Sequence, residues 1–198
     1  MRVLPAGDRA VLVELDSLAE VHGLHRSVLA SGLAVHSVPG WRTLLVTTEG
    51  DVRTLAEGLA TLASASPVTT QQRRHEIPVR YDGADLDDVA RACGLSRDDV
   101  VALHASVDYV VAFLGFGRGF PYLAGLPAQL HLPRRATPRT RVPAGSVAIA
   151  HDQCGIYPAP SPGGWHLLGT TSIVLFDPDL DPPSPYAPGD LVRFVPVT

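Results

Sequence analysis

The stretch VPAGSVAIAHDQCGIYPAPSPGGWHLLG, residues 142–169, decides the fold of the second half of the chain. It is dense in glycine and proline, which mark turns. Two apolar runs within it, VAIA and WHLLG, are typical of short buried strands. Tight turns that alternate with short buried strands predict a small barrel or a folded-over sheet, with small residues at the tips of its turns.

The segments around this stretch extend the same pattern. We expect a strand at 75–81, short helices at 85–94 and 96–107, and an apolar strand at 108–114. Further strands are expected at 146–150, 155–157, 165–168, 172–176 and 191–195. Residues 73–198 therefore predict a mainly-β C-terminal domain of the barrel type.

The first part of the chain predicts a small α+β domain over residues 1–72. A strand at 9–15 precedes a helix that the Ser17–Glu20 capping box begins. Strands at 34–38 and 41–48 and a second helix from Val52 follow. One more strand would complete a ferredoxin-like unit; residues 75–81 could supply it or could begin the second domain. The polar residues 64–74 predict the linker.

Composition excludes several classes of protein. The chain has 198 residues and a net charge of −4, which argues against general nucleic-acid binding. No apolar run reaches the length of a membrane span, and the N-terminus lacks the layout of a signal peptide, so we expect a cytoplasmic protein without a membrane segment. Two cysteines are too few for a disulfide framework or a cysteine zinc site.

The chain contains no lysine, because all 16 basic residues are arginine. It therefore cannot carry biotin on a lysine, form a Schiff base or supply the lysine of a phosphate-binding loop. The lysine base of amidase-type serine hydrolases is missing too. Arginine stays protonated and does not replace lysine in these roles.

The segment FLGFGRGFPYLAGL, residues 113–126, combines aromatic residues with glycines. Its Phe116, Phe120 and Tyr122 are candidates to line a pocket or a partner interface. The alternative is a core strand followed by a packed turn.

Two further groups of residues are candidates for binding an anion. PRRATPRTR, residues 133–141, presents Arg134 and Arg139 on a backbone that prolines hold extended, unless this is merely a solvated basic loop. The turns at 143–146 and 161–165 can expose backbone N–H groups to an anion or oxyanion, or can be barrel turns without a ligand. Ser146 and Ser161 lack the sequence context of a nucleophile elbow.

The cysteine and histidine patterns favour structural roles. Cys154 follows His151 by three residues, but no third group is in view to orient such a pair. His22 and His25 lie three residues apart on a predicted helix, and without a third ligand we expect a surface pair. We expect no metal site.

The motifs from Phe116 onward resemble a known family. They are GFGRGFPYLAGL (115–126), PRRATPRTRVPAGSVAIA (133–150), GIYPAPSPGGWHLLG (155–169), LFDP (175–178) and PGD (188–190). The family is variously called allophanate hydrolase subunit 1, the B subunit of 5-oxoprolinase and inhibitor of the sporulation histidine kinase, and it recurs in the carboxyltransferase part of urea carboxylase. The resemblance implies an N-terminal ferredoxin-like domain and a C-terminal cyclophilin-like barrel.

The resemblance also implies a function for the chain. It would be the B subunit of an ATP-dependent 5-oxoprolinase, which opens the lactam of 5-oxoproline to glutamate together with a second, larger barrel subunit. ATP would be used by the assembled complex, and the chain would be inactive alone. Motif positions make the following residues candidates for binding the small carboxylate or amide substrate: Arg134, Arg139, Ser146, Tyr157, Ser161, Gly163, Gly164 and Trp165.

Two alternatives remain open at this stage. One is a non-enzymatic protein that binds and inhibits a sensor histidine kinase, and the other is a component of a biotin-dependent urea carboxyltransferase. The sequence departs from the family pattern at Arg118, where proline is usual, and at Thr170, where arginine is usual. These departures leave the substrate undecided.

Overall fold

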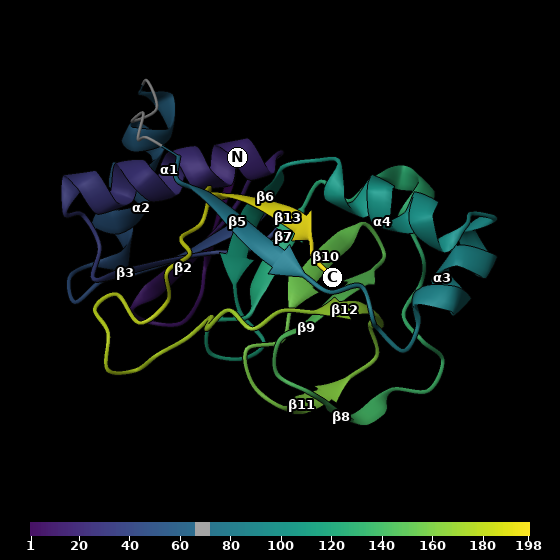
Figure 1. Cartoon of the computed structure of the whole chain (residues 1–198). Coiled ribbons are helices and arrows are strands. Elements are labelled where there is room, and N and C mark those ends of the chain that lie inside the picture. Colours follow the sequence, from purple (N-terminus) through teal and green to yellow (C-terminus); the bar gives the residue numbers. More distant parts are fainter. Residues whose placement is uncertain (66–71) are drawn as a thin grey trace. The chain divides into compact units, whose positions relative to one another are not determined.

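The computed structural model describes residues 1–65 and 72–198, which fall into two compact units, Met1–Gln71 and Gln72–Thr198 (Figure 1). Each unit has its own hydrophobic core. The linker expected at residues 64–74 lies largely outside the described residues.

A four-stranded antiparallel sheet forms the base of the first unit. The strands are β1 (Arg2–Pro5), β2 (Ala10–Glu14), β3 (His36–Pro39) and β4 (Thr43–Thr47), in the order β1-β2-β4-β3. The additional strand of this sheet is β1, which precedes the elements expected from the sequence and pairs with β2. Residues 75–81, which could have supplied it, belong to the second unit. Sequence patterning missed it because none of its side chains is fully buried.

Two helices accompany this sheet. They are α1 (Leu18–Ser31), which Ser17 caps by accepting from the Glu20 N–H, and α2 (Val52–Ser64). The expectation of a surface histidine pair on α1 is wrong, because His22 and His25 are both buried. Helix α1 contacts β3, β4 and α2, so its buried face is wider than one apolar stripe. The His25 Nδ1 atom lies 2.9 Å from the Ser37 hydroxyl.

The second unit is built on a seven-stranded sheet with the order β12-β9-β10-β7-β6-β13-β5. Its strands are β5 (Arg74–Val79), β6 (Tyr109–Leu114), β7 (Pro121–Ala124), β9 (Ser146–Ala150), β10 (Gln153–Ile156), β12 (His166–Thr170) and β13 (Leu191–Pro196). Beyond the end of β5, Arg80 forms a bridge with Thr170 on β12, through N···O distances of 2.9 and 2.8 Å. This bridge joins the two edge strands, so the sheet is a nearly closed barrel.

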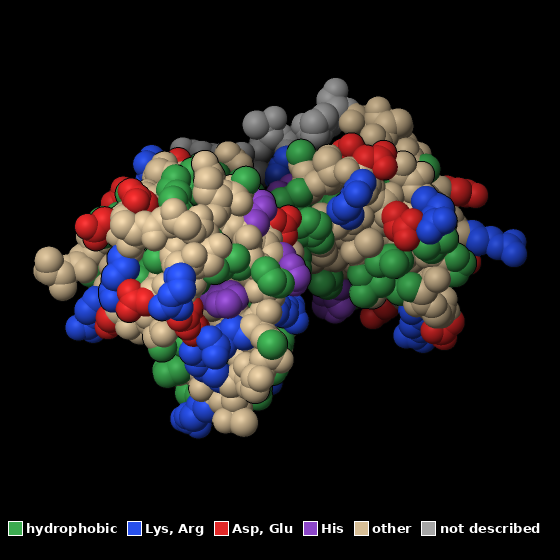
Figure 2. Space-filling model, turned by 90° about the vertical axis from the view of Figure 1, so that its right-hand side faces the viewer, with side chains coloured by type: hydrophobic (Ala, Val, Ile, Leu, Met, Phe, Trp, Pro, Cys, Tyr) green, Lys and Arg blue, Asp and Glu red, His purple; other side chains and the backbone are tan. Residues whose placement is uncertain are grey.

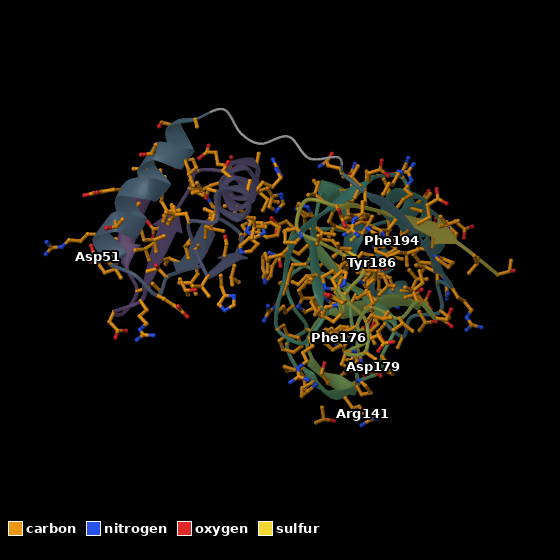
Figure 3. All side chains as sticks on the ribbon, turned by 90° about the vertical axis from the view of Figure 1, so that its left-hand side faces the viewer. Asp51, Arg141, Phe176, Asp179, Tyr186 and Phe194 are labelled. Atoms are coloured by element: carbon orange, nitrogen blue, oxygen red, sulfur yellow. The ribbon has the colours of Figure 1, made fainter. Side chains whose placement is uncertain are left out.

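Helices cover part of this barrel. They are α3 (Leu86–Cys93), α4 (Arg97–Ala105) and the short 3₁₀ helix η1 (Ala128–Leu130). Ser96 and Asp99 form the reciprocal capping box that begins α4. Tyr186 and Phe194 are buried in the core of this unit (Figure 3).

Two local expectations for the second unit were wrong. Residues 172–176 form no strand: Leu175 is buried and Val174 is exposed, so the alternation is present, but no neighbouring strand pairs with the segment. Residues 161–163 belong to a strand and not to a turn, because β11 (Ser161–Gly163) pairs with β8 (Arg139–Val142) in a separate two-stranded sheet. This pair lies at one end of the unit (Figure 1).

The surface carries both signs of charge. Arginine and acidic side chains are interspersed over the visible face of the molecule (Figure 2). Among the described residues, no helix is both long and apolar enough to cross a membrane.

Candidate functional site

A second cluster of buried residues lies on the outer face of the barrel sheet. Strand β9 is buried on both faces: Val147 and Ile149 pack into the barrel core, whereas Ala148 and Ala150 pack against aromatic residues on the other side. The apolar run VAIA, residues 147–150, is therefore apolar throughout because its strand lies between two clusters of buried side chains. The outer cluster comprises Phe120, Val142, Ala148, Ala150, Tyr157, Trp165 and Leu167, with Tyr122 packed against it.

Phe120 is the centre of this aromatic cluster. Its ring makes edge contacts with Tyr157 and Trp165, at centroid distances of 5.2 and 5.6 Å. Phe116 approaches it at 5.6 Å, and Tyr122 lies 5.7 Å from Trp165. Such T-shaped contacts favour one arrangement of the rings over others. The cluster is therefore a wall of packed aromatic rings, which we call the aromatic wall.

A cavity of about 80 Å³ opens in this wall. It brings together eight of the residues expected to form a site or an interface. The lining is Phe116, Phe120, Tyr122, Arg134, Tyr157, Pro162, Gly163, Gly164 and Trp165. Segments 116–122, 134, 157 and 162–165, which are separate in sequence, thus converge on one place.

Glycine at two positions allows the aromatic rings to lie against the backbone. A Cβ atom on Gly155 would lie 2.8 Å from the Phe120 ring, and one on Gly163 would lie 2.2 Å from the Tyr157 hydroxyl oxygen. Both distances are shorter than real contacts allow. The glycines of the 142–169 stretch therefore make room for the aromatic wall as well as for turns.

We expect Gly163→Ala to displace the Tyr157 hydroxyl and to lower the free energy of unfolding by about 1–3 kcal/mol, as other overpacked sites do. Gly117→Ala is the matched control, since a Cβ atom there would meet nothing within 4 Å. Urea unfolding and the near-UV circular dichroism of both variants test this. Equal stability of the two variants would contradict the close approach of Gly163 to Tyr157.

Arg134 is the cation of the cavity. It is exposed, lines the cavity, and makes no ion pair within the part of the chain that the structure describes. Burial raises the pKa of Tyr157 and of Tyr122, while the Arg134 charge opposes the rise in both. Both phenols are therefore neutral at pH 7 and lie within the field of the same guanidinium group. A backbone hydrogen bond from Trp165 acts on Tyr157 in the same direction as Arg134.

Arg139 has a different role from the one expected. Its Nη1 and Nη2 atoms donate to the two carboxylate oxygens of Asp85, at 2.9 and 2.8 Å. Arg135 pairs with the same carboxylate. Asp85 itself is 1% exposed and also accepts from the backbone N–H of Leu167 at 2.8 Å. Arg139 is thus held by an internal ion pair and is not among the residues that line the cavity.

The pKa of Asp85 reflects this arrangement. Burial alone would raise it, but hydrogen bonds from Arg139 and Leu167 and the charges of the two arginines outweigh burial and hold the pKa below its ordinary value. From the sequence, Asp85 is expected only as the first residue of a helix. The signal that would reveal it is spatial, since Asp85 lies 50 residues before Arg135.

The two serine candidates lie apart from the aromatic cavity. Ser146 is buried, and its hydroxyl donates to the Pro143 carbonyl at 2.8 Å, which closes a tight turn. Ser161 lines a neighbouring hollow of about 500 Å³, which Phe116 and Arg118 also line. Thr170 lines a different hollow, and its hydroxyl donates a hydrogen bond to the Asp82 carboxylate at 2.9 Å. The two departures from the family pattern therefore do not share a site.

Cys154 belongs to a buried chain of polar groups. Its Sγ atom lies 3.2 Å from His104 Nε2, and His104 Nδ1 lies 2.8 Å from the Tyr81 hydroxyl. Burial raises the pKa of the Cys154 thiol and lowers the pKa of His104 to about 3. His151, the neighbour considered in the sequence, is exposed and is not this partner. A fully buried thiol whose pKa is raised is a poor nucleophile.

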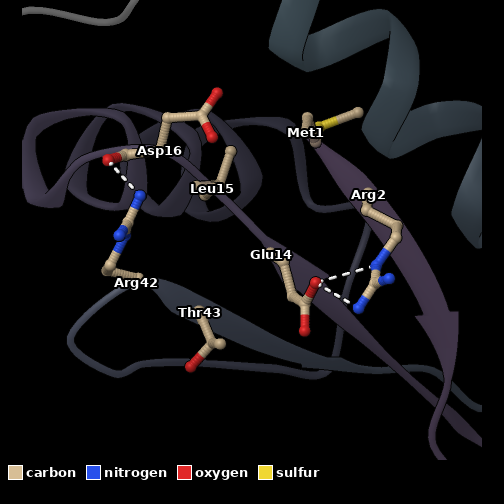
Figure 4. A pocket seen from close by; sticks show the side chains of 7 residues that line it. All are labelled: Met1, Arg2, Glu14, Leu15, Asp16, Arg42 and Thr43. Atoms are coloured by element: carbon tan, nitrogen blue, oxygen red, sulfur yellow. Dashed lines mark hydrogen bonds and ion pairs between the residues drawn. The ribbon is translucent and has the colours of Figure 1, made fainter.

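Other places in the molecule fit a catalytic site less well. A hollow of about 530 Å³ in the first unit contains two arginines, but Arg2 pairs with Glu14, and Arg42 donates to the Asp16 carbonyl at 2.9 Å (Figure 4). Among residues 1–65 and 72–198, no three His, Cys, Asp or Glu side chains could together hold a metal ion.

The fold and the cavity define a class of protein: a small, nearly closed barrel with an aromatic site beside the guanidinium group of Arg134. The comparison of the sequence with protein families then places the chain. Residues 1–186 match the family described as carboxyltransferase domain, subdomain C and D, and the chain belongs to this family.

Relatives extend over nearly the whole chain. A protein of Escherichia coli O157:H7, named as the B subunit of 5-oxoprolinase, is 44% identical over 96% of this chain and 93% of its own length. A protein of Haemophilus influenzae with the same name is 40% identical over 98% of this chain and 97% of its own. The family resemblance seen in the sequence is confirmed.

Solved structures agree on the fold. The crystal structure of TTHA0988 superposes with a TM-score of 0.83 at 40% identity, covering 96% of this chain, which spans 40% of that longer chain. The urea amidolyase of Kluyveromyces lactis gives a TM-score of 0.73 at 23% identity over 99% of this chain and 15% of its own, which shows the fold alone. The assignment of the two units as ferredoxin-like and cyclophilin-like domains stays a prediction.

Proposed function

We propose that this chain is the B subunit of an ATP-dependent 5-oxoprolinase and that its aromatic cavity forms part of the site for 5-oxoproline. The two relatives named as the B subunit of 5-oxoprolinase support this role as a subunit, since they match the chain nearly from end to end. The observation that supports this assignment of the site is that Arg134 and the aromatic wall line the same cavity.

The lining matches a small cyclic amide that bears a carboxylate. Arg134 offers a charged fork to the carboxylate, and the aromatic side chains that line the cavity offer apolar contacts to the ring. The neutral hydroxyls of Tyr122 and Tyr157 can donate to a lactam oxygen and can stabilise charge as it develops there. This chain thus binds and polarises the substrate.

The remaining steps need a partner. In the proposed reaction the amide oxygen takes the γ-phosphoryl group of ATP and ADP leaves. Water then adds to the carbonyl carbon and the C–N bond breaks, and hydrolysis of the resulting acyl phosphate by a second water gives glutamate and phosphate. The absence of lysine removes the residue of a phosphate-binding loop, so we assign ATP to the assembled complex and derive no step for it on this chain. We propose the second, larger barrel subunit of the same system as the partner, with the chain inactive alone.

The hollow beside the cavity is our candidate for part of the partner interface. Phe116 is 67% exposed, has a positive φ of 61°, and lines both the cavity and the hollow. Phe176, Pro158 and Pro178 add apolar surface there. An exposed apolar area next to a ligand site is typical of a joint between subunits.

Co-expression with the neighbouring subunit gene tests the assembly. We expect the two chains to co-elute at micromolar concentration and to bury at least about 1,000 Å² in total. Phe116→Asp should weaken the complex without changing the stability of the isolated chain, because this side chain is exposed. Leu29→Asp, at an exposed leucine of the first unit, is the matched control. Failure of the wild-type chains to associate would contradict the proposal.

A further inference from the structure

The loop that carries Arg134 is fixed on both sides of this residue. On one side, the His166 Nε2–H donates to the Pro133 carbonyl at 2.9 Å. On the other side, the Arg135 backbone N–H donates to the Gly164 carbonyl at 2.8 Å. Gly164 itself lines the cavity. The backbone on either side of Arg134 is therefore held beside the cavity by hydrogen bonds to the segment that leads into β12.

Asp85 adds a second layer of support to the same loop. It accepts from Arg135 and, through both oxygens, from Arg139, which stands at the start of β8. Its own backbone is tied to β12, since the Asp85 N–H donates to the Leu167 carbonyl at 3.1 Å while the Leu167 N–H donates to the Asp85 carboxylate. One buried carboxylate thus joins α3, β12, β8 and the arginine loop.

The charges of this cluster do not balance. Arg134, Arg135 and Arg139 carry three positive charges, and within the described residues Asp85 is their only acidic partner. Two positive charges remain, and Arg134 is the one of the three arginines that lines the cavity. An excess of positive charge at a partly apolar cavity attracts an anion.

We propose that Asp85 is a positioning residue: by fixing Arg135 and Arg139, it holds the Arg134 guanidinium group at the aromatic cavity, where Arg134 binds the carboxylate of a small cyclic ligand. This inference rests on the proposed function for the ring chemistry of the ligand. It adds the buried group, Asp85, that orients the arginine already assigned to the carboxylate.

Two probes separate recognition of the carboxylate from recognition of the ring. They are 5-oxoproline and 2-pyrrolidinone, which has the same lactam ring without the carboxylate. Each is titrated into the full chain, and binding is followed by NMR chemical-shift changes. We expect the wild-type chain to prefer 5-oxoproline by about 10- to 100-fold, the range of a charged hydrogen bond.

The variants have distinct expected results. Arg134→Ala should bind both probes equally, because only the carboxylate contact is lost. Asp85→Asn and the milder Arg135→Lys should reduce the preference severalfold while binding of 2-pyrrolidinone is retained. A purely structural role for Asp85 would leave the ratio of the two affinities unchanged at a temperature well below unfolding. Asp87→Asn, which removes an exposed ion pair with Arg97 on the neighbouring helix, is the matched control.

A wild-type chain without preference for 5-oxoproline, or an Arg134→Ala variant that keeps the preference, would overturn the inference. In the assembled complex, Arg134→Ala should raise the KM for 5-oxoproline. An unchanged KM would overturn the inference and the assignment of Arg134 to the substrate site, but it would leave the role of the chain as the B subunit standing. Conversely, the chain could still prefer 5-oxoproline to 2-pyrrolidinone while the assembled complex fails to open 5-oxoproline. That result would contradict the proposed function but not the inference about Asp85.

Discussion

Asp85→Ala is expected to lower the free energy of unfolding of the second unit by about 3–5 kcal/mol, the range for breaking a buried ion pair from one side. The substitution leaves the guanidinium groups of Arg135 and Arg139 without their acid partner and removes the acceptor of the Leu167 N–H. Arg139→Ala should also destabilise the protein, because it removes two hydrogen bonds to the buried Asp85 carboxylate. Urea unfolding at pH 7 measures both.

Asp87→Ala provides the comparison for this prediction. Asp87 lies two residues further along the chain, in α3, but its side chain is 64% exposed in its pair with Arg97. An exposed pair of this kind contributes about 0–1 kcal/mol. If Asp85→Ala were no more destabilising than Asp87→Ala, the internal ion-pair cluster would not be the support that we describe.

Acid is expected to destabilise the second unit well before its carboxylates are protonated. Burial lowers the pKa of His104 from 6.5 to about 3, so the folded state keeps this ring neutral while the unfolded chain binds a proton. Stability is therefore full above pH 6.5 and falls by about 1.4 kcal/mol per pH unit between pH 6.5 and 3. His25, with a pKa lowered to about 4 chiefly by burial, should have the same effect in the first unit.

The carboxylates act at lower pH. The pKa values of Asp85 and Asp190 lie below their ordinary value because hydrogen bonds and arginine charges outweigh burial. Their stabilisation is present above about pH 4 and is lost as the pH falls further. The range from pH 6.5 to 4.5 therefore reports on the histidines.

Unfolding by urea at several pH values tests the histidine effect. His104→Gln should lower stability at pH 7.5, since it removes contacts with Cys154 and Tyr81, but it should flatten the slope between pH 6.5 and 4.5. His151→Asn, at an exposed histidine of the same unit, should leave the slope as it is. An unchanged slope in His104→Gln would contradict a neutral buried His104.

Much of the fold could be predicted from local patterns. The capping pattern at Ser17, the alternation in β2 and the turn-rich stretch at 142–169 each predicted an element that the structure contains. The presence of strand β1 and the absence of a strand at 172–176 could not be predicted. Whether a segment forms a strand depends on whether a neighbouring strand pairs with it. Pairing across a sheet is a property of the tertiary structure and leaves no local signal.

Most residues of the candidate cavity could be proposed from the sequence, but Arg139, Ser146 and Ser161 do not line it, and the roles of the residues were not predictable. The motifs named Arg134, Tyr157, Gly163 and Trp165, which the structure brings to one cavity. Arg134 and Arg139 have similar sequence surroundings. Only the contact with Asp85, which is distant in sequence, shows that Arg139 is held in an ion pair whereas Arg134 is not. His104, which forms the contact with Cys154, likewise lies 50 residues away from it.

The most direct test of the account is ATP-dependent opening of 5-oxoproline by the complex reconstituted from separately purified subunits. We predict that glutamate forms only when this chain is added, that the chain alone gives none, and that Arg134→Ala raises the KM for 5-oxoproline about 10-fold or more, as expected for loss of a charged hydrogen bond. Equal glutamate formation with and without this chain would contradict its role as a component of 5-oxoprolinase.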